Sequence, residues 1–275
     1  MSVHASPQPG GAGRPVTIAD LQAYADAGEK FAMLTAYDFT SAAILDEAGI
    51  PVILVGDSLG MVVLGHDSTV PVTMDEMIHH TRAVRRGARR ALVVGDLPFG
   101  SYQASLEEGL VNGMRVLKEA GANAVKLEGH HPELTRRLVA AGVPVMGHLG
   151  LTPQSVNQLG GYKVQGRGEE AADRLVAQAR ELEAAGAFSL VLESVPSDVG
   201  RRVAEVLRIP VIGIGAGPDT DGQVLVFHDF LGMTGGHLPR FVKQYANLRG
   251  EIVAAAKAYS AEVASGDYPG PEHQY

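Results

Sequence analysis

The sequence of 275 residues contains no cysteine. This absence excludes disulfide bonds, thiolate metal sites and a cysteine nucleophile. No apolar run approaches the roughly 20 residues that a helix needs to cross a bilayer, so we expect no membrane span. The first fifteen residues also lack the hydrophobic segment of a secretory signal, and they are rich in Pro, Gly and Ser. We therefore predict a cytoplasmic protein whose residues 1–15 form a disordered arm.

Positive charge is also scarce. The chain has 31 acidic and 23 basic residues, which gives a net charge of −8. The basic stretch "RRGARR", residues 85–90, is the exception, but it ends a helical pattern, where cations suit the helix dipole. Without a basic patch, we expect no nucleic-acid partner.

One short pattern recurs along the chain: Ala-Gly followed by an apolar run of strand length. Its glycines are Gly49, Gly121, Gly142 and Gly186, and each follows an amphipathic stretch, as a glycine that stops a helix does. The runs that follow are β-branched and almost continuously hydrophobic. This is typical of parallel strands that are covered on both faces.

Counting such runs predicts eight strands, near residues 31–36, 51–55, 91–95, 123–128, 143–147, 188–193, 209–214 and 224–228. Helical patterns lie at 74–90, 105–120, 132–141, 169–185, 198–207 and 240–263. This alternation predicts an α/β fold, one (β/α)8 TIM barrel over residues 16–265 with a tail over 266–275. A doubly wound open sheet is the alternative. No G-x-G-x-x-G follows the first strand, which argues against a dinucleotide-binding version.

Two connections are too long for plain turns, one from Leu59 to Thr73 and one from Leu149 to Gly168. Both follow the carboxyl end of a predicted strand, the face on which barrels carry their sites. Long loops there are often lids. The segment "LGGYKVQGRG" in the second connection has four glycines in ten residues and could act as a hinge.

Polar side chains gather where the predicted strands end. Because these ends converge on one rim of a barrel, we expect one site there. Its candidate residues are Asp57 and Ser58 after the second strand, Asp96 after the third, Lys126 and Glu128 in the fourth, His148 after the fifth, and Glu193 in the sixth.

The three acids Asp57, Asp96 and Glu128 come from consecutive strands and would repel one another unless a cation joins them. Oxygen ligands suit Mg²⁺, whereas zinc is disfavoured by the lack of cysteine and of paired histidine patterns. A structural alternative is that each acid caps a helix or pairs with an arginine. The gathering of several acids with one lysine favours the metal site.

Bound Mg²⁺ with open positions polarises a 2-oxo acid. Glu193 lies across the rim, where it could remove the proton next to the carbonyl. The residues alone thus predict metal-assisted enolisation of a 2-oxo acid. His148 stays open between a wall of the site and a structural hydrogen-bonding residue.

Several long blocks resemble one known family closely. Among them are "LTAYDFTSA", "GDSLGMVVLGHDSTVPVTMDEM", "GDLPFGSYQ", "VKLEG", "GHLGLTPQSVNQLGGYKVQGR" and "IPVIGIGAGPDTDGQVLVFHD". They look like the 3-methyl-2-oxobutanoate hydroxymethyltransferase (ketopantoate hydroxymethyltransferase) family, over about residues 15 to 260. The resemblance implies the barrel of the phosphoenolpyruvate and isocitrate lyase superfamily. It also implies synthesis of 2-dehydropantoate for pantothenate, with 5,10-methylenetetrahydrofolate as the one-carbon donor.

The resemblance further implies roles for the candidate residues. Asp57, Asp96 and Glu128 match the positions that hold one Mg²⁺ per subunit, with Glu128 bound directly or through water. Asp57, Ser58, Asp96 and Lys126 match positions that bind the oxo acid, and Glu193 matches the general base. The family also implies a homodecamer, a pentamer of dimers.

Two other functions stay open at this point. A sister enzyme of the superfamily could cleave or rearrange a carbon–carbon or phosphorus–carbon bond, but such lyases typically use a cysteine that this chain lacks. A metabolite-binding barrel without catalysis would not need a base opposite the metal.

Overall fold

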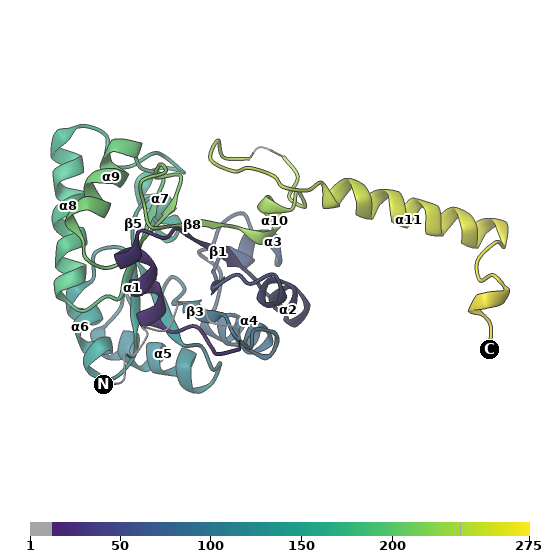
Figure 1. Ribbon diagram of the computed structural model, residues 1–275, viewed down its shortest axis with the longest axis horizontal. Helices are drawn as coiled ribbons and strands as arrows, with labels where there is room; N and C mark the ends of the chain where they lie inside the picture. Colours follow the sequence, from purple (N-terminus) through teal and green to yellow (C-terminus); the bar gives the residue numbers. More distant parts are fainter. Residues whose placement is uncertain (1–12, 237) are drawn as a thin grey trace, which may run out of the picture. The chain divides into compact units, whose positions relative to one another are not determined.

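The computed structural model describes residues 13–236 and 238–275, and its first part is a closed barrel of eight parallel strands (Figure 1). The strands follow one another around the barrel in chain order. Their bounds are β1 Phe31–Thr35, β2 Val52–Val55, β3 Leu92–Asp96, β4 Ala124–Glu128, β5 Val145–Gly150, β6 Ser189–Glu193, β7 Val211–Ile214 and β8 Gly222–Leu225. Because β8 pairs with β1, the predicted barrel is confirmed and the open sheet is excluded.

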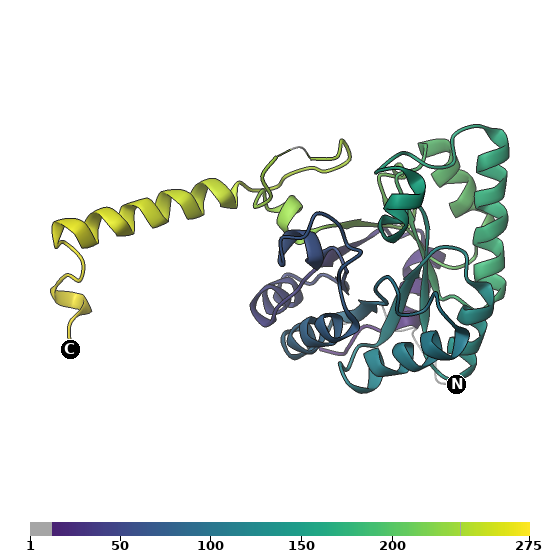
Figure 2. The same ribbon diagram turned by 180° about the vertical axis from the view of Figure 1, so that it is seen from behind.

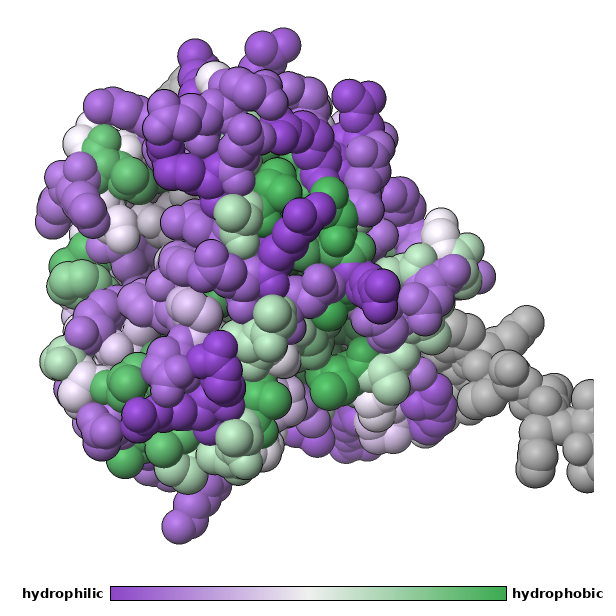
Figure 3. All heavy atoms as spheres, turned by 90° about the vertical axis from the view of Figure 1, so that its left-hand side faces the viewer, coloured by the Kyte–Doolittle hydropathy of each residue, from purple (hydrophilic) through white to green (hydrophobic). Residues whose placement is uncertain are grey.

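The helices lie around the outside of these strands (Figure 1, Figure 2). Their bounds are α1 Ile18–Ala27, α2 Phe39–Glu47, α3 Leu59–Val62, α4 Met74–Gly87, α5 Leu106–Lys118, α6 Pro132–Ala140, α7 Val156–Leu159, α8 Glu169–Ala184 and α9 Ser197–Val206, with a 3-10 turn η1 Pro153–Ser155. The predicted helices from 74 to 207 match α4, α5, α6, α8 and α9 within three residues at each end. Seen from the side of α8, the outer surface is mostly hydrophilic (Figure 3).

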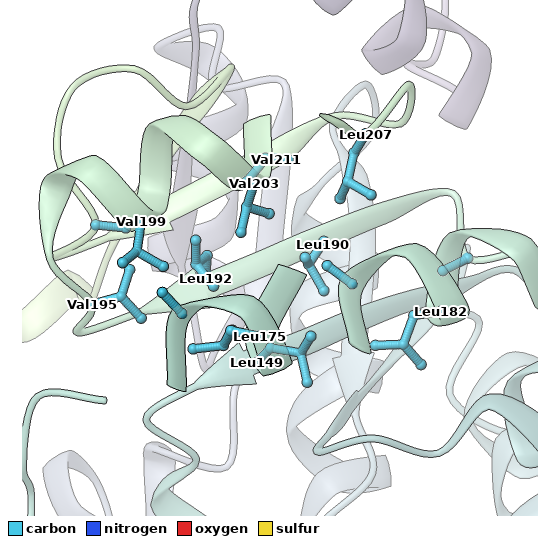
Figure 4. Packing of buried hydrophobic residues seen from close by; sticks show 14 residues of the cluster. Leu149, Leu175, Leu182, Leu190, Leu192, Val195, Val199, Val203, Leu207 and Val211 are labelled. Atoms are coloured by element: carbon cyan, nitrogen blue, oxygen red, sulfur yellow. The ribbon is translucent and has the colours of Figure 1, made fainter. Parts of the chain in front are cut away.

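Two hydrophobic layers hold the barrel together. Inside the strands, residues such as Met33, Met146 and Ile212 form one cluster, and Leu21 of α1 packs against it. Between strands β5 to β7 and helices α8 and α9 lies a second cluster, in which Leu182 and Leu190 are fully buried (Figure 4). Strands buried on both faces explain why the sequence shows unbroken hydrophobic runs rather than alternation.

Two strands are displaced from their predicted ranges. β8 covers Gly222–Leu225 rather than 224–228, and residues 227 and 228 begin a short helix. The sequence favoured residues 143–147, but β5 runs over Val145–Gly150 and so includes His148. Gly147 and Gly150 interrupt the apolar run and made the strand look shorter. Gly150, at φ 89°, has no room for a side chain, since a carbon there would lie 2.2 Å from Glu193 O.

Residues Phe227–Tyr275 form a second compact unit. It contains α10 Phe227–Phe230, α11 Leu248–Ser265 and a 3-10 turn, η2 Pro271–His273. The helix predicted at 240–263 thus begins eight residues later, and of the residues described in α11 none is buried. The predicted domain of residues 16–265 spans both units, and the predicted tail lies in the second.

Of the predicted arm at residues 1–15, residues 1–12 lie outside the described part of the chain. Within the described part, no helix combines the length and apolar character that a membrane span requires.

Candidate active site

The loop after β2 brings an acid and a hydroxyl to the carboxyl end of the barrel. A side-chain carbon at Gly56 would lie 2.8 Å from Ser58 Oγ, so a larger residue there would require the serine hydroxyl to move. Asp57 follows and is buried, and its backbone N–H donates to Asp96 Oδ2 at 3.1 Å. This hydrogen bond ties the loop after β2 to the carboxylate at the end of β3.

Asp96, the last residue of β3, faces Lys126 of β4. The strand register pairs these two residues. Lys126 Nζ lies 3.1 Å from Asp96 Oδ1, and both side chains are buried. The same ammonium lies 3.2 Å from Nδ1 of His148 on β5. A buried ion pair of this kind is retained only where further polar groups compensate its desolvation.

Glu128, His148 and Glu193 continue the site onto β4, β5 and β6. His148 Nδ1 lies 3.5 Å from Glu128 Oε1, and its Nε2 lies 3.3 Å from Glu193 Oε2. The Glu193 side chain is 15% exposed, against 3% for Glu128. His148 therefore bridges the two carboxylates, and Glu193 is the more accessible of them.

Sequence reasoning missed Gln154, which lies in η1 of the loop after β5. Its Nε2 donates to Asp57 Oδ2 at 2.8 Å and to Leu97 O at 2.9 Å, while its backbone N–H donates to Glu128 Oε2 at 2.9 Å. Its Oε1 accepts from the hydroxyl of Tyr102 at 2.7 Å. Gln154 is buried and joins Asp57 to Glu128. A local pattern could not reveal it, because its partners lie 26 to 97 residues away in the chain.

Ser58, predicted to bind the oxo acid, lies within this region and contacts an aromatic hydroxyl. Its Oγ is 2.9 Å from the hydroxyl oxygen of Tyr37, while the Nδ1 of His80 lies 2.6 Å from Tyr37 O. The structure thus brings every predicted site residue to one end of the barrel. Tyr37 is a neighbour that the sequence did not predict.

Burial and charge repulsion dominate the electrostatics on the β2 and β3 side. Burial, with the charges of Glu128 and Asp96, raises the pKa of Asp57 well above its ordinary value. Burial also raises the pKa of Asp96, although Lys126 opposes the shift. For Lys126, burial lowers the pKa, but the charges of Asp96, Glu128 and Asp57 outweigh it, so the net pKa is raised. The lysine stays cationic among acids that are costly to ionise together.

The β4 to β6 side shows the opposite balance. Burial raises the pKa of Glu128, but the hydrogen bond and charge of His148, together with Lys126, outweigh it and lower the net pKa. Burial and the charge of Lys126 lower the pKa of His148, but Glu128 and Glu193 outweigh both, so that its pKa is about 9. Four carboxyl groups thus share two cationic side chains, and Asp57 and Asp96 are the two whose ionised forms are disfavoured.

The donor set fits a small divalent cation held by few protein ligands. In the described residues, no group of three or more His, Asp or Glu side chains is arranged to hold a metal ion. Asp57 and Asp96 are nonetheless adjacent and buried, and Asp96 Oδ1 has no hydrogen-bond partner within the described part beyond its ion pair with Lys126. Mg²⁺ keeps several waters and takes one or two carboxylates, so these two acids suit it.

Comparison with known sequences identifies the family. A family model described as "Ketopantoate hydroxymethyltransferase" matches residues 15–271. The chain is 57% identical over 268 residues to the 3-methyl-2-oxobutanoate hydroxymethyltransferase of Thermobifida fusca, covering 97% of this chain and 95% of that one. It is also 57% identical over 262 residues to the enzyme of that name from Moorella thermoacetica, covering 94% and 97%.

The chain belongs to the ketopantoate hydroxymethyltransferase family. The predicted resemblance is confirmed, and membership makes the chain a transferase. The open possibilities of a sister lyase and of a barrel without catalysis are therefore set aside.

Solved structures with low sequence identity share the fold of this ketopantoate hydroxymethyltransferase family member. One neighbour is 2,3-dimethylmalate lyase, a member of the PEP mutase/isocitrate lyase superfamily, with a TM-score of 0.58, 16% identity and coverage of 92% of this chain and 89% of that one. Another is a complex of phosphonopyruvate hydrolase with oxalate and Mg²⁺, with a TM-score of 0.58, 14% identity and coverage of 94% and 93%. The predicted barrel fold is therefore confirmed, and these neighbours share it.

Proposed function

We propose that the chain transfers a hydroxymethyl group from 5,10-methylenetetrahydrofolate to 3-methyl-2-oxobutanoate, giving 2-dehydropantoate and tetrahydrofolate. Family membership supports the transferase chemistry. The observation that carries the proposal is the arrangement of acids at the barrel mouth. Two buried carboxylates, Asp57 and Asp96, lie on one side with Lys126, and the more accessible Glu193 lies on the other.

Asp57 and Asp96 would hold one Mg²⁺, with Glu128 in reach through water. The raised pKa values of the two aspartates support this assignment, because a divalent cation relieves the repulsion that disfavours their ionised forms. A phosphonopyruvate hydrolase of the same fold was solved with Mg²⁺ and oxalate, which resembles the carboxylate end of a 2-oxo acid. When bound, the ion would polarise the carbonyl of the oxo acid.

Lys126 and Ser58 complete the binding of the oxo acid in this proposal. The ammonium of Lys126 is fixed by Asp96 and can pair with negative charge that develops on the substrate oxygen. The hydroxyl of Ser58 is held beside Tyr37 and can donate to a carboxylate oxygen. Glu193 removes the proton from C3. Its carboxylate is available as a base because it does not hold the proposed metal ion with Asp57 and Asp96.

The atoms balance as follows in the proposed reaction. C3 loses its proton to Glu193 and forms a bond to the methylene carbon of the donor. Both bonds from that carbon to folate nitrogens break, and water supplies the hydroxyl oxygen. The former C3 proton and the second proton of the water end on the two folate nitrogens. Nothing is oxidised or reduced in the sum.

Incubation of the protein with 3-methyl-2-oxobutanoate, methylenetetrahydrofolate and Mg²⁺ tests the proposal, with 2-dehydropantoate as the expected product. Titration calorimetry then tests the metal site. Asp57→Ala and Asp96→Ala should each abolish the Mg²⁺-dependent binding of the oxo acid, because each removes a proposed ligand. Binding at unchanged affinity in both variants would remove these residues from the site.

We further propose that the chain acts in the cytoplasm in pantothenate biosynthesis and assembles as a decamer. The family name supports the pathway, and the absence of cysteine suits a reducing compartment. Sedimentation velocity checks the assembly, which should show ten chains of 28.9 kDa each.

A further inference from the structure

The glycine-rich segment of residues 160–168 crosses the mouth of the barrel. At one point it is tied to the end of β6, where Gln165 N–H donates to Ser194 O at 2.9 Å. At another, the hydroxyl of Tyr162 contacts Met61 Sδ in α3, after β2, at 3.6 Å. In a closed barrel of eight strands, β2 and β6 lie four strands apart and so on opposite sides. The segment therefore reaches across the carboxyl ends of the strands.

This segment presents an apolar and aromatic surface at the mouth. Tyr162 is 50% exposed, Val164 is 41% exposed, and Met61 opposite them is 39% exposed. Partial burial raises the pKa of Tyr162, and so do the negative charges of Glu193, Asp57 and Glu128. The side chains of Tyr162, Val164 and Met61 form a hydrophobic contact surface next to the cluster of acids. The small oxo acid does not need such a surface.

Two cations belong to the same segment. Lys163 and Arg167 are exposed, and among the described residues neither forms an ion pair. Gly160 comes close to the lysine, since a side-chain carbon there would lie 3.3 Å from Lys163 Nζ. The segment therefore combines an aromatic face with two positive charges above a site that is otherwise acidic.

We propose that residues 160–168 and Met61 form the binding site of the one-carbon donor. The flat heteroaromatic part of the folate packs against Tyr162 and Met61, and the carboxylates of its glutamate tail pair with Lys163 and Arg167. This inference rests on the proposed function, which requires a methylene carbon to reach C3 of the oxo acid. The donor has to arrive at the mouth, because on the other side of the site the barrel interior is filled by a packed cluster of side chains.

Two substitutions at one position test the aromatic contact. Tyr162→Ala should raise the KM for methylenetetrahydrofolate by roughly tenfold, the scale of one lost stacking contact. Tyr162→Phe keeps the ring and should stay near the wild type. The KM for the oxo acid and its folate-independent exchange of the C3 proton in heavy water should be unchanged in both variants. Titration calorimetry should likewise show that tetrahydrofolate binds more weakly to Tyr162→Ala than to the wild type or to Tyr162→Phe.

The tail contact is tested by shortening the donor. Lys163→Met and Arg167→Met should each weaken the glutamate-bearing donor about threefold, as expected for exposed ion pairs. Neither should affect a methylenetetrahydropteroate, which lacks the glutamate. Lys118→Met is the matched control, since Lys118 is an exposed lysine at the end of α5, a helix on the outside of the barrel.

The two proposals fail in different ways. Wild-type protein that makes no 2-dehydropantoate would refute the proposed function. Wild-type activity with an unchanged folate KM in Tyr162→Ala would overturn the donor site alone. A loss of C3 exchange in Tyr162→Ala equal to its loss of turnover would also overturn it, because the segment would then act on the oxo acid. If Lys163→Met and Arg167→Met weaken the binding of the donors with and without glutamate equally, the proposed tail contact is refuted.

Discussion

Gln154 is the residue that ties the two halves of the site together. It donates to Asp57 with its side chain and to Glu128 with its backbone, and it is itself held by Tyr102. The sequence predicts the acids, because they end hydrophobic strands. It does not predict Gln154 or Tyr102, because both lie in loops and neither belongs to a repeating pattern. Replacing a residue that hydrogen-bonds a metal ligand typically lowers metal affinity or activity by about 10- to 100-fold.

We expect the replacement of Gln154 to weaken metal binding. Gln154→Ala leaves Asp57 without its amide donor, so we expect the affinity for Mn²⁺, a spectroscopic substitute for Mg²⁺, to fall about tenfold. Electron paramagnetic resonance of free Mn²⁺ measures it directly. Gln22→Ala on α1 is a matched control. Equal Mn²⁺ affinities in the wild type and Gln154→Ala would show that the glutamine has no part in positioning the acid.

Replacing Lys126 should lower turnover. Lys126→Ala removes the buried ammonium beside Asp96, and we expect kcat to fall by roughly 10² or more, the scale of losing one charge-stabilising donor. Steady-state kinetics test it, with thermal unfolding as a check that the barrel stays folded and Lys118→Ala as the control. Near-normal turnover would leave this lysine a structural role only.

Among the elements, strands were easier to predict than short helices. Parallel strands buried on both faces give unbroken apolar runs, and all eight were found. β5 lies two to three residues later than predicted, because of its glycines, and β8 lies two to three residues earlier. Gly49 was predicted to stop an amphipathic helix, and α2 does end just before it, but no range was predicted for this helix. The apolar residues of "FTSAAILDE" do not form one helical stripe. Its start did carry a signal, since the side chain of Asp38 accepts from Ser41 N–H as a helix cap does.

The start of α1 should make folding stability depend on pH. Asp20 is buried, pairs with Arg14 and accepts from the N–H and hydroxyl of Thr17. The hydrogen bond from Arg14 is the largest cause that lowers its pKa to about 2. Because the folded pKa lies below the unfolded value of about 3.9, the stabilisation is complete above pH 4 and is lost as pH falls towards 2.

Urea unfolding of the wild type and of Asp20→Asn measures this effect. At pH 7 the variant should be less stable by about 1 kcal/mol, since Arg14 is partly exposed and solvent screens the pair. The difference should shrink between pH 4 and pH 2. A difference that stays constant over that range would contradict the assigned ion pair.

For the whole molecule, the sequence could predict the barrel and the rim on which its polar residues meet. It could do so because a closed parallel barrel brings the carboxyl ends of all its strands together, so that the place of Glu193 relative to Asp57 follows from strand number alone. The contacts across the mouth could not be predicted. The approach of Tyr162 to Met61 depends on the path of a glycine-rich loop, and no periodic pattern records that path.

In the proposed reaction, Glu193 takes the C3 proton of the oxo acid before the donor is involved. Exchange of that proton with deuterium in heavy water, followed by NMR without folate, measures this step alone. Wild-type protein with Mg²⁺ should exchange the C3 proton. Glu193→Gln keeps the shape and loses the base, so it should still bind Mg²⁺ and oxo acid but exchange far more slowly. Undiminished exchange in Glu193→Gln would show that another residue is the base, and His148 would be the next to test.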